Sequence, residues 1–417
     1  MTRIMSAGIA LCVAAASLLF GAEYPVTDTA VKHIPAIKKP AYLKSYIDPV
    51  FGTKVTRITG EPGLDIPNIK GKWAEIARHH YSKDAAWNCD QSLLLLARHR
   101  GRPRMLFLDG NTYVPLFGYD RSAGAETRWH PNRPAIMVYV KDNVIGYWDV
   151  CRNITQVIAT FPGYREFRIG PSEGNLSLDG RLIVVTAKKG SDRIAFAYEL
   201  QNKHKYPDLI LNDVIVDWVS ISASGKYIVL NDEIDGGKDQ TQVYDLAGNK
   251  IGKLWAEYGR PSHYDLTVDE NGDDIAVGVS KSKPDVGRVI KRRLRDGKVT
   301  VLTPGGYAGH TSTRNVKRPG WAYVTYQGRS PNWPPYWDEV VAVKLDGSMT
   351  VERIAHLHTK RIDYWTEAHA VPSPDGRRVL WASNWESPSG RPIGTYVADT
   401  RRRKLPTLVT TNGERLP

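Results

Sequence analysis

The stretch Ser373-Pro374-Asp375-Gly376, followed directly by Arg377-Arg378-Val379-Leu380-Trp381, decides the fold of this chain. A polar, turn-forming tetrad leads straight into an apolar strand, and degenerate copies of this pattern recur. The six other copies end at Gln91, Arg133, Gly180, Gly225, Gly272 and Gly320, about 42 to 56 residues apart. Such periods in a strand-rich chain are typical of propeller blades, small sheets that cannot bury their faces alone. The sequence therefore predicts an all-β, seven-bladed β-propeller.

Each repeat follows the same order of strands. An inner strand leads into the tetrad, and a second, apolar strand follows at once. These second strands are predicted at Leu93–Leu96, Ala135–Val140, Arg181–Thr186, Tyr227–Leu230, Asp274–Val279, Trp321–Tyr326 and Arg378–Ala382. A third strand often ends in Asp and a turn, and a fourth ends near Thr, as in Val299–Thr303. This order predicts blades of four antiparallel strands.

The N-terminal segment Asp48–Thr59 copies the end of a repeat. It can supply an outer strand that closes the ring, or begin an eighth, partial blade. Closure removes the open sheet edges that invite aggregation. The 417 residues would allow two or three domains, but seven units of about 45 residues use nearly all of them. We therefore expect an N-terminal extension over residues 23–52 and a single propeller domain over 53–417.

Residues 1–22 have the pattern of a secretory signal peptide. Arg3 gives a basic start, Ile9–Phe20 an apolar segment, and Gly21-Ala22 a small-residue exit. An uncleaved anchor is the alternative. No later segment is long and apolar enough to span a bilayer. We therefore expect a periplasmic or secreted protein.

The formal net charge of +13 favours anionic partners for an exported protein. The alternative is a solvated basic surface, of which Lys291–Arg295 is an example. Cys89 and Cys151 occupy different places in their repeats, so two free thiols are expected, although export would permit a disulfide.

The tetrads also mark the same position in every repeat, so counting back from them identifies the residues expected at the central funnel of the ring. The residue about seven positions before the end of each tetrad should stand at the funnel mouth. These positions hold Asp84, Glu126, Glu173, Asp217, His263 or Asp265, His310 and His369. Ionisable groups on buried inner strands bind a ligand or bond to one another. The alternative to a binding site is therefore a water-filled, mutually hydrogen-bonded channel.

Three histidines beside carboxylates suit a divalent cation such as Mn²⁺, Zn²⁺ or Ca²⁺. The metal-ligand candidates are His263, His310, His369 and Glu367. They come from different blades, so no local spacing motif supports them.

The loops expected around the funnel mouth are rich in aromatic and basic residues. Flat rings stack on sugars, and Arg binds carboxylates through two parallel hydrogen bonds. The candidates for substrate binding are Arg78, His80, Tyr81, Tyr307, Trp333, Trp337, Arg361, Tyr364 and Trp385. We expect an anionic glycan as partner, no nucleic acid, and a monomer.

The stretches Gly309-His310-Thr311-Ser312, Glu367–Gly376 and Trp381–Trp385 resemble the TolB-like propellers, and among these the oligogalacturonate lyases. The resemblance implies that three His and a Gln hold a manganese ion, which neutralises the uronate carboxylate for β-elimination. His310 and His369 fall at matching places. Val371 and Thr366 stand where the remaining His and Gln would follow, which implies an altered or absent metal site. His263 or Glu367 can substitute.

β-Elimination requires that a metal or an Arg neutralise the uronate carboxylate, because this acidifies the α-proton. A side chain then removes that proton. Arg260 and Tyr264 are the candidates for the base. The alternative is a non-catalytic, TolB-like propeller that binds a protein or a glycan.

Overall fold

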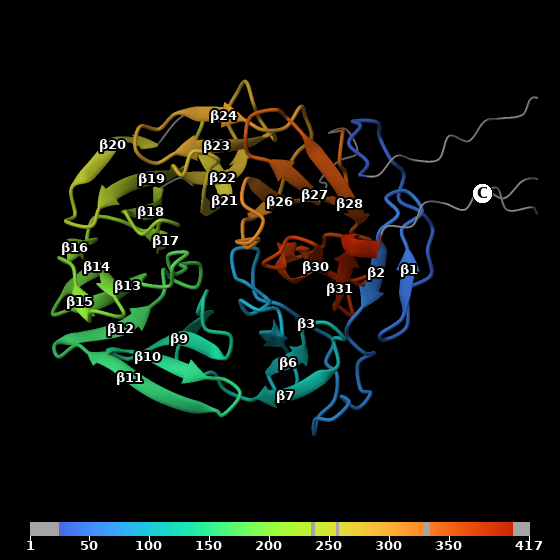
Figure 1. Cartoon of the computed structure of the whole chain (residues 1–417), viewed down its shortest axis with the longest axis horizontal. Coiled ribbons are helices and arrows are strands. Elements are labelled where there is room, and N and C mark those ends of the chain that lie inside the picture. The colour runs from blue at the N-terminus through green and yellow to red at the C-terminus, as the bar shows by residue number, and fades with distance from the viewer. Residues whose placement is uncertain (1–24, 235–237, 256–257, 328–333, 403–417) are drawn as a thin grey trace, which may run out of the picture.

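The computed structural model describes residues 25–234, 238–255, 258–327 and 334–402. The segment 1–22 lies outside these residues. Seven antiparallel blades follow one another around a central axis (Figure 1). The all-β, seven-bladed propeller is therefore confirmed.

The first three blades use the strands of the N-terminal half. Blade 1 comprises β3 (Ala77–Arg78), β4 (Leu93–Leu96), β5 (Arg98–His99), β6 (Met105–Asp109) and β7 (Pro115–Tyr119). Blade 2 comprises β8 (Glu126–Trp129), β9 (Ile136–Lys141), β10 (Val144–Asp149) and β11 (Ile154–Thr160). Blade 3 comprises β12 (Tyr164–Arg168), β13 (Leu182–Lys189), β14 (Asp192–Glu199), β15 (His204–Lys205) and β16 (Leu209–Ile210). Blade 1 is irregular, because β4, β6 and β7 form its sheet while β3 pairs only with β5.

The next three blades are regular four-stranded meanders. Blade 4 comprises β17 (Val216–Ile221), β18 (Tyr227–Ile234), β19 (Lys238–Asp245) and β20 (Lys250–Trp255). Blade 5 comprises β21 (Pro261–Val268), β22 (Asp274–Ser280), β23 (Val289–Arg293) and β24 (Val299–Val301). Blade 6 comprises β25 (His310–Ser312), β26 (Trp321–Tyr326), β27 (Glu339–Lys344) and β28 (Val351–His356). All seven second strands lie where the tetrads predict them.

The tetrad is a tight turn whose last residue is left-handed in six of the seven repeats, Arg133 being the exception. In blade 7, Gly376 has φ +67° and its N–H donates to the Ser373 carbonyl over 2.8 Å. The Ser373 hydroxyl accepts a bond from the Arg378 N–H, the first residue of the next strand. Glycine adopts this backbone region without steric cost, which explains its recurrence at the end of the tetrad.

Blade 7 closes the ring with a strand from the N-terminal segment. Its own strands are β29 (Val371–Pro372), β30 (Arg378–Ser383) and β31 (Gly394–Asp399). β2 (Lys54–Arg57) pairs antiparallel with β31, and β1 (Ser45–Ile47) adds a fifth strand. Figure 1 shows β1 and β2 in blue beside β30 and β31 in red. The expected closing strand is therefore confirmed, and the segment extends the seventh blade rather than beginning an eighth.

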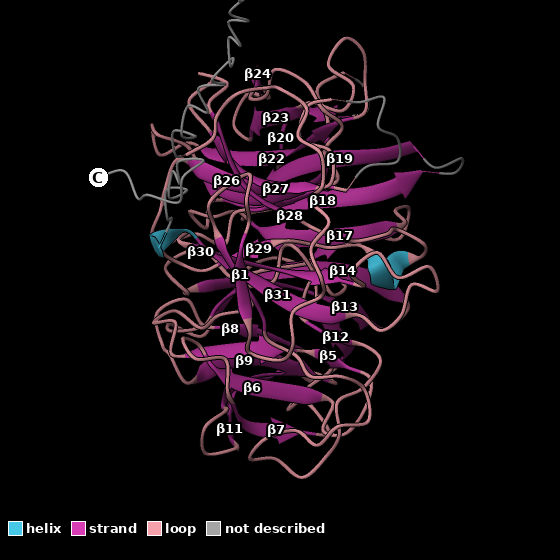
Figure 2. Ribbon diagram, turned by 90° about the vertical axis from the view of Figure 1, so that its right-hand side faces the viewer, coloured by secondary structure: helices cyan, strands magenta, loops and turns pink. Residues whose placement is uncertain are grey.

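The seams between blades form the cores of the molecule. In one seam, Val277 of blade 5 packs with Val324 and Val341 of blade 6. Figure 2 shows the sheets stacked one above another, with the two short helices at the margins. These are the 3₁₀ turns η1 (Tyr364–Thr366) and η2 (Thr400–Arg402). Cys89 and Cys151 are both free thiols.

No helix among the described residues has the length and apolar character that crossing a membrane requires.

Candidate functional site

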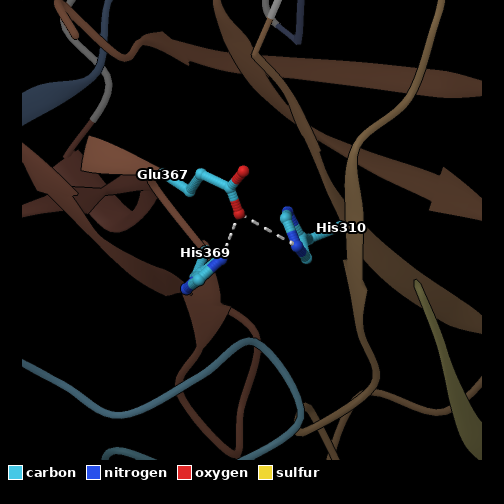
Figure 3. Close-up of side chains that lie close together, drawn as sticks. All are labelled: His310, Glu367 and His369. Carbon is cyan, nitrogen blue, oxygen red and sulfur yellow. Dashed lines mark hydrogen bonds and ion pairs between the residues drawn. The ribbon is translucent and has the colours of Figure 1, made fainter. Parts of the chain in front are cut away.

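Two neighbouring blades bring His310, Glu367 and His369 together at the funnel (Figure 3). His310 begins β25, and the other two residues lie between η1 and β29. Glu367 Oε2 is 3.1 Å from His369 Nε2 and 3.6 Å from His310 Nε2. All three residues are buried, and among the described residues they are the one group whose donor atoms converge in this way.

The segment that carries Glu367 and His369 is held firmly against blade 6. The Gln327 side chain donates to the Thr366 carbonyl over 2.8 Å and accepts from the Ala368 N–H over 2.9 Å. On the other side, Asp363 and Thr366 form a capping box around η1. These bonds fix the segment so that Glu367 and His369 share one side of the funnel. No motif in the sequence singled out Gln327.

Both imidazoles of the cluster are neutral at neutral pH. The pKa of His310 lies well below its ordinary value because of burial and then the nearby His369 and His263. The pKa of His369 is lowered in the same way by burial and then by Arg78 and His79. Neutral imidazole is the form that ligates metals.

The donor set fits a divalent metal ion in type and in spacing. Ligand bonds of about 2.0 to 2.2 Å place neighbouring donor atoms roughly 3.0 to 3.6 Å apart. The two separations of Glu367 Oε2 from the imidazole nitrogens fall in this range. The group therefore suits an ion bound by two imidazoles and one carboxylate.

Two arginines contact the outer atoms of the same group. Arg361, which is exposed, pairs with Glu367 Oε1. Arg78 donates to His369 Nδ1 over 2.8 Å and to the carbonyls of Trp365 and Glu367. Because Nδ1 accepts this bond, the proton of the neutral ring sits on Nε2, facing Glu367, and it would have to leave before Nε2 could bind a metal ion. Arg78 is only 1% exposed, so it positions His369 and is closed to a substrate in the funnel.

Tyr81 and His263 extend the cluster across the funnel. The Tyr81 ring lies 5.4 Å from the ring of His310 and 4.6 Å from that of His369. Its hydroxyl is 3.5 Å from His263 Nδ1, and the His263 ring is 4.6 Å from that of His310. His80 turns away from this group and bonds to Asp84.

A bulge in β21 decides which residue of blade 5 faces the cluster. The strand register shifts between Ser262 and Asp265, and His263 has φ +46°. This irregularity aims His263 at His310. Asp265 instead binds Arg314 through both carboxylate oxygens, at 2.9 and 3.0 Å.

The four other carboxylates that the tetrad spacing predicts at the funnel mouth have protein partners. Arg128 is 3.1 Å from Asp84, and Lys83 is 2.5 Å from Glu173. Glu126 accepts from the Ile169 N–H over 2.8 Å, and Asp217 accepts from Asn231 over 2.7 Å. These four carboxylates are thus paired within the protein.

Several other candidates lie apart from the cluster. Tyr264 is 1% exposed, packs on Trp218 and bonds to Thr241, so it cannot touch a substrate. Trp385 stacks on His358 and donates to the Ile37 carbonyl, which anchors the N-terminal extension.

The remaining candidates differ in how far they are exposed. Tyr364 is 53% exposed, with its ring 5.4 Å from that of His369. Arg260 directly precedes β21, and Tyr307 and Trp337 are half-buried. Trp333 lies outside the described residues.

Comparison with known proteins supports the fold. No family model matches the chain, and no curated protein matches its sequence. An oligogalacturonate lyase solved in complex with manganese is 15% identical, covers 87% of this chain and 96% of its own, and has a TM-score of 0.58. The oligogalacturonate lyase of Vibrio parahaemolyticus is 11% identical, with coverages of 89% and 97% and a TM-score of 0.56. TolB from Acinetobacter baumannii is 14% identical, with coverages of 79% and 64% and a TM-score of 0.37. The resemblance to oligogalacturonate lyases is thus confirmed as a likeness of fold.

Proposed function

We propose that this protein binds a uronate-containing glycan in its funnel and cleaves it by β-elimination. One observation carries the proposal: two neutral imidazoles and a carboxylate converge beneath a mouth that presents Arg361 and Tyr364. His310, Glu367 and His369 would hold a divalent cation. The manganese in the similar lyase structure agrees with this assignment.

A bound cation would supply Lewis-acid neutralisation of the uronate carboxylate, which acidifies the adjacent C–H bond. Arg361 can fork the same or a neighbouring carboxylate, and the exposed ring of Tyr364 can stack on a sugar. Glu367 orients Arg361, and Arg78 orients His369. The chain's own residues thus position the acidic sugar above the cluster.

Proton removal falls to His263 or Arg260 at the mouth of blade 5. The pKa of His263 is lowered to about 4, first by the protein atoms around it and then by Lys281 and Lys83, so the ring is unprotonated at neutral pH. Burial raises the pKa of Tyr81 well above its ordinary value, so its phenol stays protonated at neutral pH and is able to donate a hydrogen bond. Tyr264 does not serve as the base in this proposal, because its side chain is buried.

The test combines metal analysis with a lyase assay. Purified protein should carry a divalent metal, and uronate polymers should show rising ultraviolet absorbance as unsaturated ends form. The double variant His310→Ala/His369→Ala should lose both properties. His204→Ala, which removes an exposed imidazole on blade 3, is the matched control. Full activity in the double variant would refute the site.

A second function, binding without turnover, is favoured by the two arginines at the cluster. Arg78 and Arg361 bring positive charge to the outer atoms of His369 and Glu367, which opposes a cation and favours an anion. A non-catalytic binder would bind uronate oligomers equally well with and without a chelator and produce no absorbance change.

Export belongs to the same proposal and rests on the leader-like residues 1–22. The mass of the protein recovered from the periplasm or medium should correspond to a chain that begins near residue 23. Recovery of only full-length, cell-retained chain would contradict export.

A further inference from the structure

A cavity of about 200 Å³ lies below the His cluster, where blades 1 and 2 meet the central channel. His79 and His80 line one end. Pro131, Leu178 and Val316, which stand beside inner turns, line the other. The volume is many times what a single water requires, so the cavity can hold a small molecule.

The cavity exists because blade 1 has no regular inner strand. The isolated bridge between Trp87 and Leu94 takes the place of a ladder there. Small side chains follow the irregular segment, and Ala85, Ala86 and Ala97 line the wall. Other seams are filled by rows of larger apolar residues, as between blades 5 and 6.

Buried N–H donors without partners face this space. Arg128 is 6% exposed, and its Nε and Nη1 donate to the carbonyls of Gly174 and Thr127, but its Nη2 has no partner. Trp129 is 7% exposed, and its indole N–H has no partner either. Buried donors normally find acceptors, so these two groups point to a ligand that supplies them.

Glu126 and one oxygen of Asp84 are engaged along the same wall, whereas Asp84 Oδ1 and His79 Nδ1 have no hydrogen-bond partner. Glu126 binds the Ile169 N–H and Arg168, while Asp84 binds His80 and Arg128. Beside these two acceptors stand the two unpartnered donors, Arg128 Nη2 and the Trp129 indole N–H. A ligand with anionic oxygens matches them better than a cation would.

The remaining wall is apolar and aromatic, with Trp87, Leu95, Trp129 and Met137. We infer that this cavity is a second binding site, separate from the His cluster, for a small carboxylate with a flat apolar body. The carboxylate binds Arg128, and the apolar body lies in the seam between blades 1 and 2. This assignment does not depend on the function proposed for the His cluster.

Entry to the cavity comes from the face opposite the cluster. The backbone from Arg78 to Tyr81 divides the two spaces: Arg78 and Tyr81 contact His369, whereas His79 and His80 line the cavity. Val316, at the far end, is 36% exposed, and Cys89 also lines the cavity. A ligand can therefore bind without passing the mouth.

The first test is calorimetric titration with benzoate as the probe. The unmodified protein should bind one benzoate, and Arg128→Gln should weaken binding at least tenfold. Arg152→Gln, which removes an exposed arginine of the same blade, should leave affinity unchanged. Inorganic phosphate should bind at least tenfold more weakly than benzoate. Equal affinity for phosphate, or for the Arg128→Gln variant, would overturn the inference.

The second test does not require Arg128 to be changed. Saturating benzoate should slow alkylation of Cys89 at least fivefold and leave the exposed Cys151 unaffected, as read by peptide mass spectrometry. Ala85→Leu should fill the cavity and abolish both benzoate binding and the protection of Cys89. Unprotected Cys89 in the unmodified protein would contradict the site.

Discussion

Buried charges in this propeller differ in how many partners they have. Arg353 is fully buried but pairs with Glu339 and donates to the Ala30 carbonyl. Asp338 is also buried, at 4% exposed, yet its Oδ2 has no hydrogen-bond partner. Since removing a charge from water costs free energy unless partners replace the water, these residues should respond oppositely to substitution.

Asp338→Asn should stabilise the protein at high pH. Burial, and then the charge of Glu386, raise the pKa of Asp338 well above its ordinary value. The folded state therefore keeps a proton that the unfolded state releases near pH 4, and stability falls as pH rises above that value. Asn removes this cost and tolerates the residue's left-handed backbone, φ +55°.

We expect the free energy of unfolding in urea to rise by about 1 to 2 kcal/mol at pH 8, with little change at pH 4. Asp142→Asn is the control, because Asp142 has φ +52° but is exposed. An equal gain in both variants would show that backbone preference, not the buried carboxyl, is responsible.

Arg378→Met should weaken the seam between blades 7 and 1. Arg378 is 1% exposed and donates to the Gly110 carbonyl, Asn111 and Gln91. Met keeps most of the volume but leaves these acceptors unpaired, at a cost of about 3 kcal/mol. Chemical denaturation should show this loss. The exposed neighbour variant Arg377→Met should lose less than about 0.5 kcal/mol.

At the scale of elements, sequence predicts local strands better than departures from them. The tetrads located all seven second strands because a left-handed turn residue and an apolar run are local signals. The missing inner strand of blade 1 depends on contacts with other blades, so no local pattern announces it. The same limit explains Trp385, whose aromatic character suited a sugar platform but whose partner is the N-terminal extension.

The candidate site shows the same division. The tetrad spacing predicted that His310 and His369 lie at the same level of the funnel. Glu367 was proposed because it lies close to His369 in the sequence. The arginine contacts with these residues depend on side-chain directions, which blade spacing does not determine. Arg78 therefore looked like a substrate ligand in the sequence, although the structure encloses it against His369.

Val55→Asp should open the ring at its closing strand. Val55 is fully buried in β2, in the core cluster that contains Trp381 and Ala398. A carboxyl group there would have no partner. Burying it would lower the free energy of unfolding by several kcal/mol, and its ionised form would favour a state in which β2 has left the ring. Thermal unfolding should begin at least about 10 °C lower, and small-angle scattering should show a larger radius.

Ile47→Asp provides the control for this substitution. It places the same carboxylate on the adjacent strand β1, where the side chain is 39% exposed. A comparable loss in the two variants would mean that β2 is no more important for closure than β1.

At the scale of the whole molecule, the basic run near Lys291 is largely neutralised. Lys291 pairs with Asp269 and Glu270, and Arg293 and Arg295 pair with Asp273. These ion pairs leave the run with little unpaired positive charge. The net charge of +13 therefore resides mainly on basic residues outside this run.

Acid should destabilise the whole propeller before its carboxylates protonate. Burial lowers the pKa values of His130 and His358 to about 4. Below pH 6.5 these two imidazoles bind protons in the unfolded state but not in the folded state. The free energy of unfolding therefore falls as the pH falls from 6.5 toward 4. Each group should contribute about 1 to 2 kcal/mol to this loss.

Urea unfolding between pH 7 and pH 4.5 measures this dependence. His130→Gln should flatten the slope, because Gln has no charge to gain in the unfolded state. The exposed His204→Gln should leave the slope unchanged. A stability curve that is flat between pH 7 and pH 5 would contradict the buried neutral state of these rings.

The closing strand also sets the order in which the molecule can be completed. Thr59 and Thr395, which bond to each other beside the β2–β31 pair, are 336 positions apart. During synthesis β2 emerges early and waits for a partner that emerges near the end. Joining such distant segments is entropically slow, and an unpaired strand edge is a template for misassociation in the meantime. Kinetic refolding should therefore end in a slow phase of ring closure, and chaperone demand should fall on the nearly finished chain.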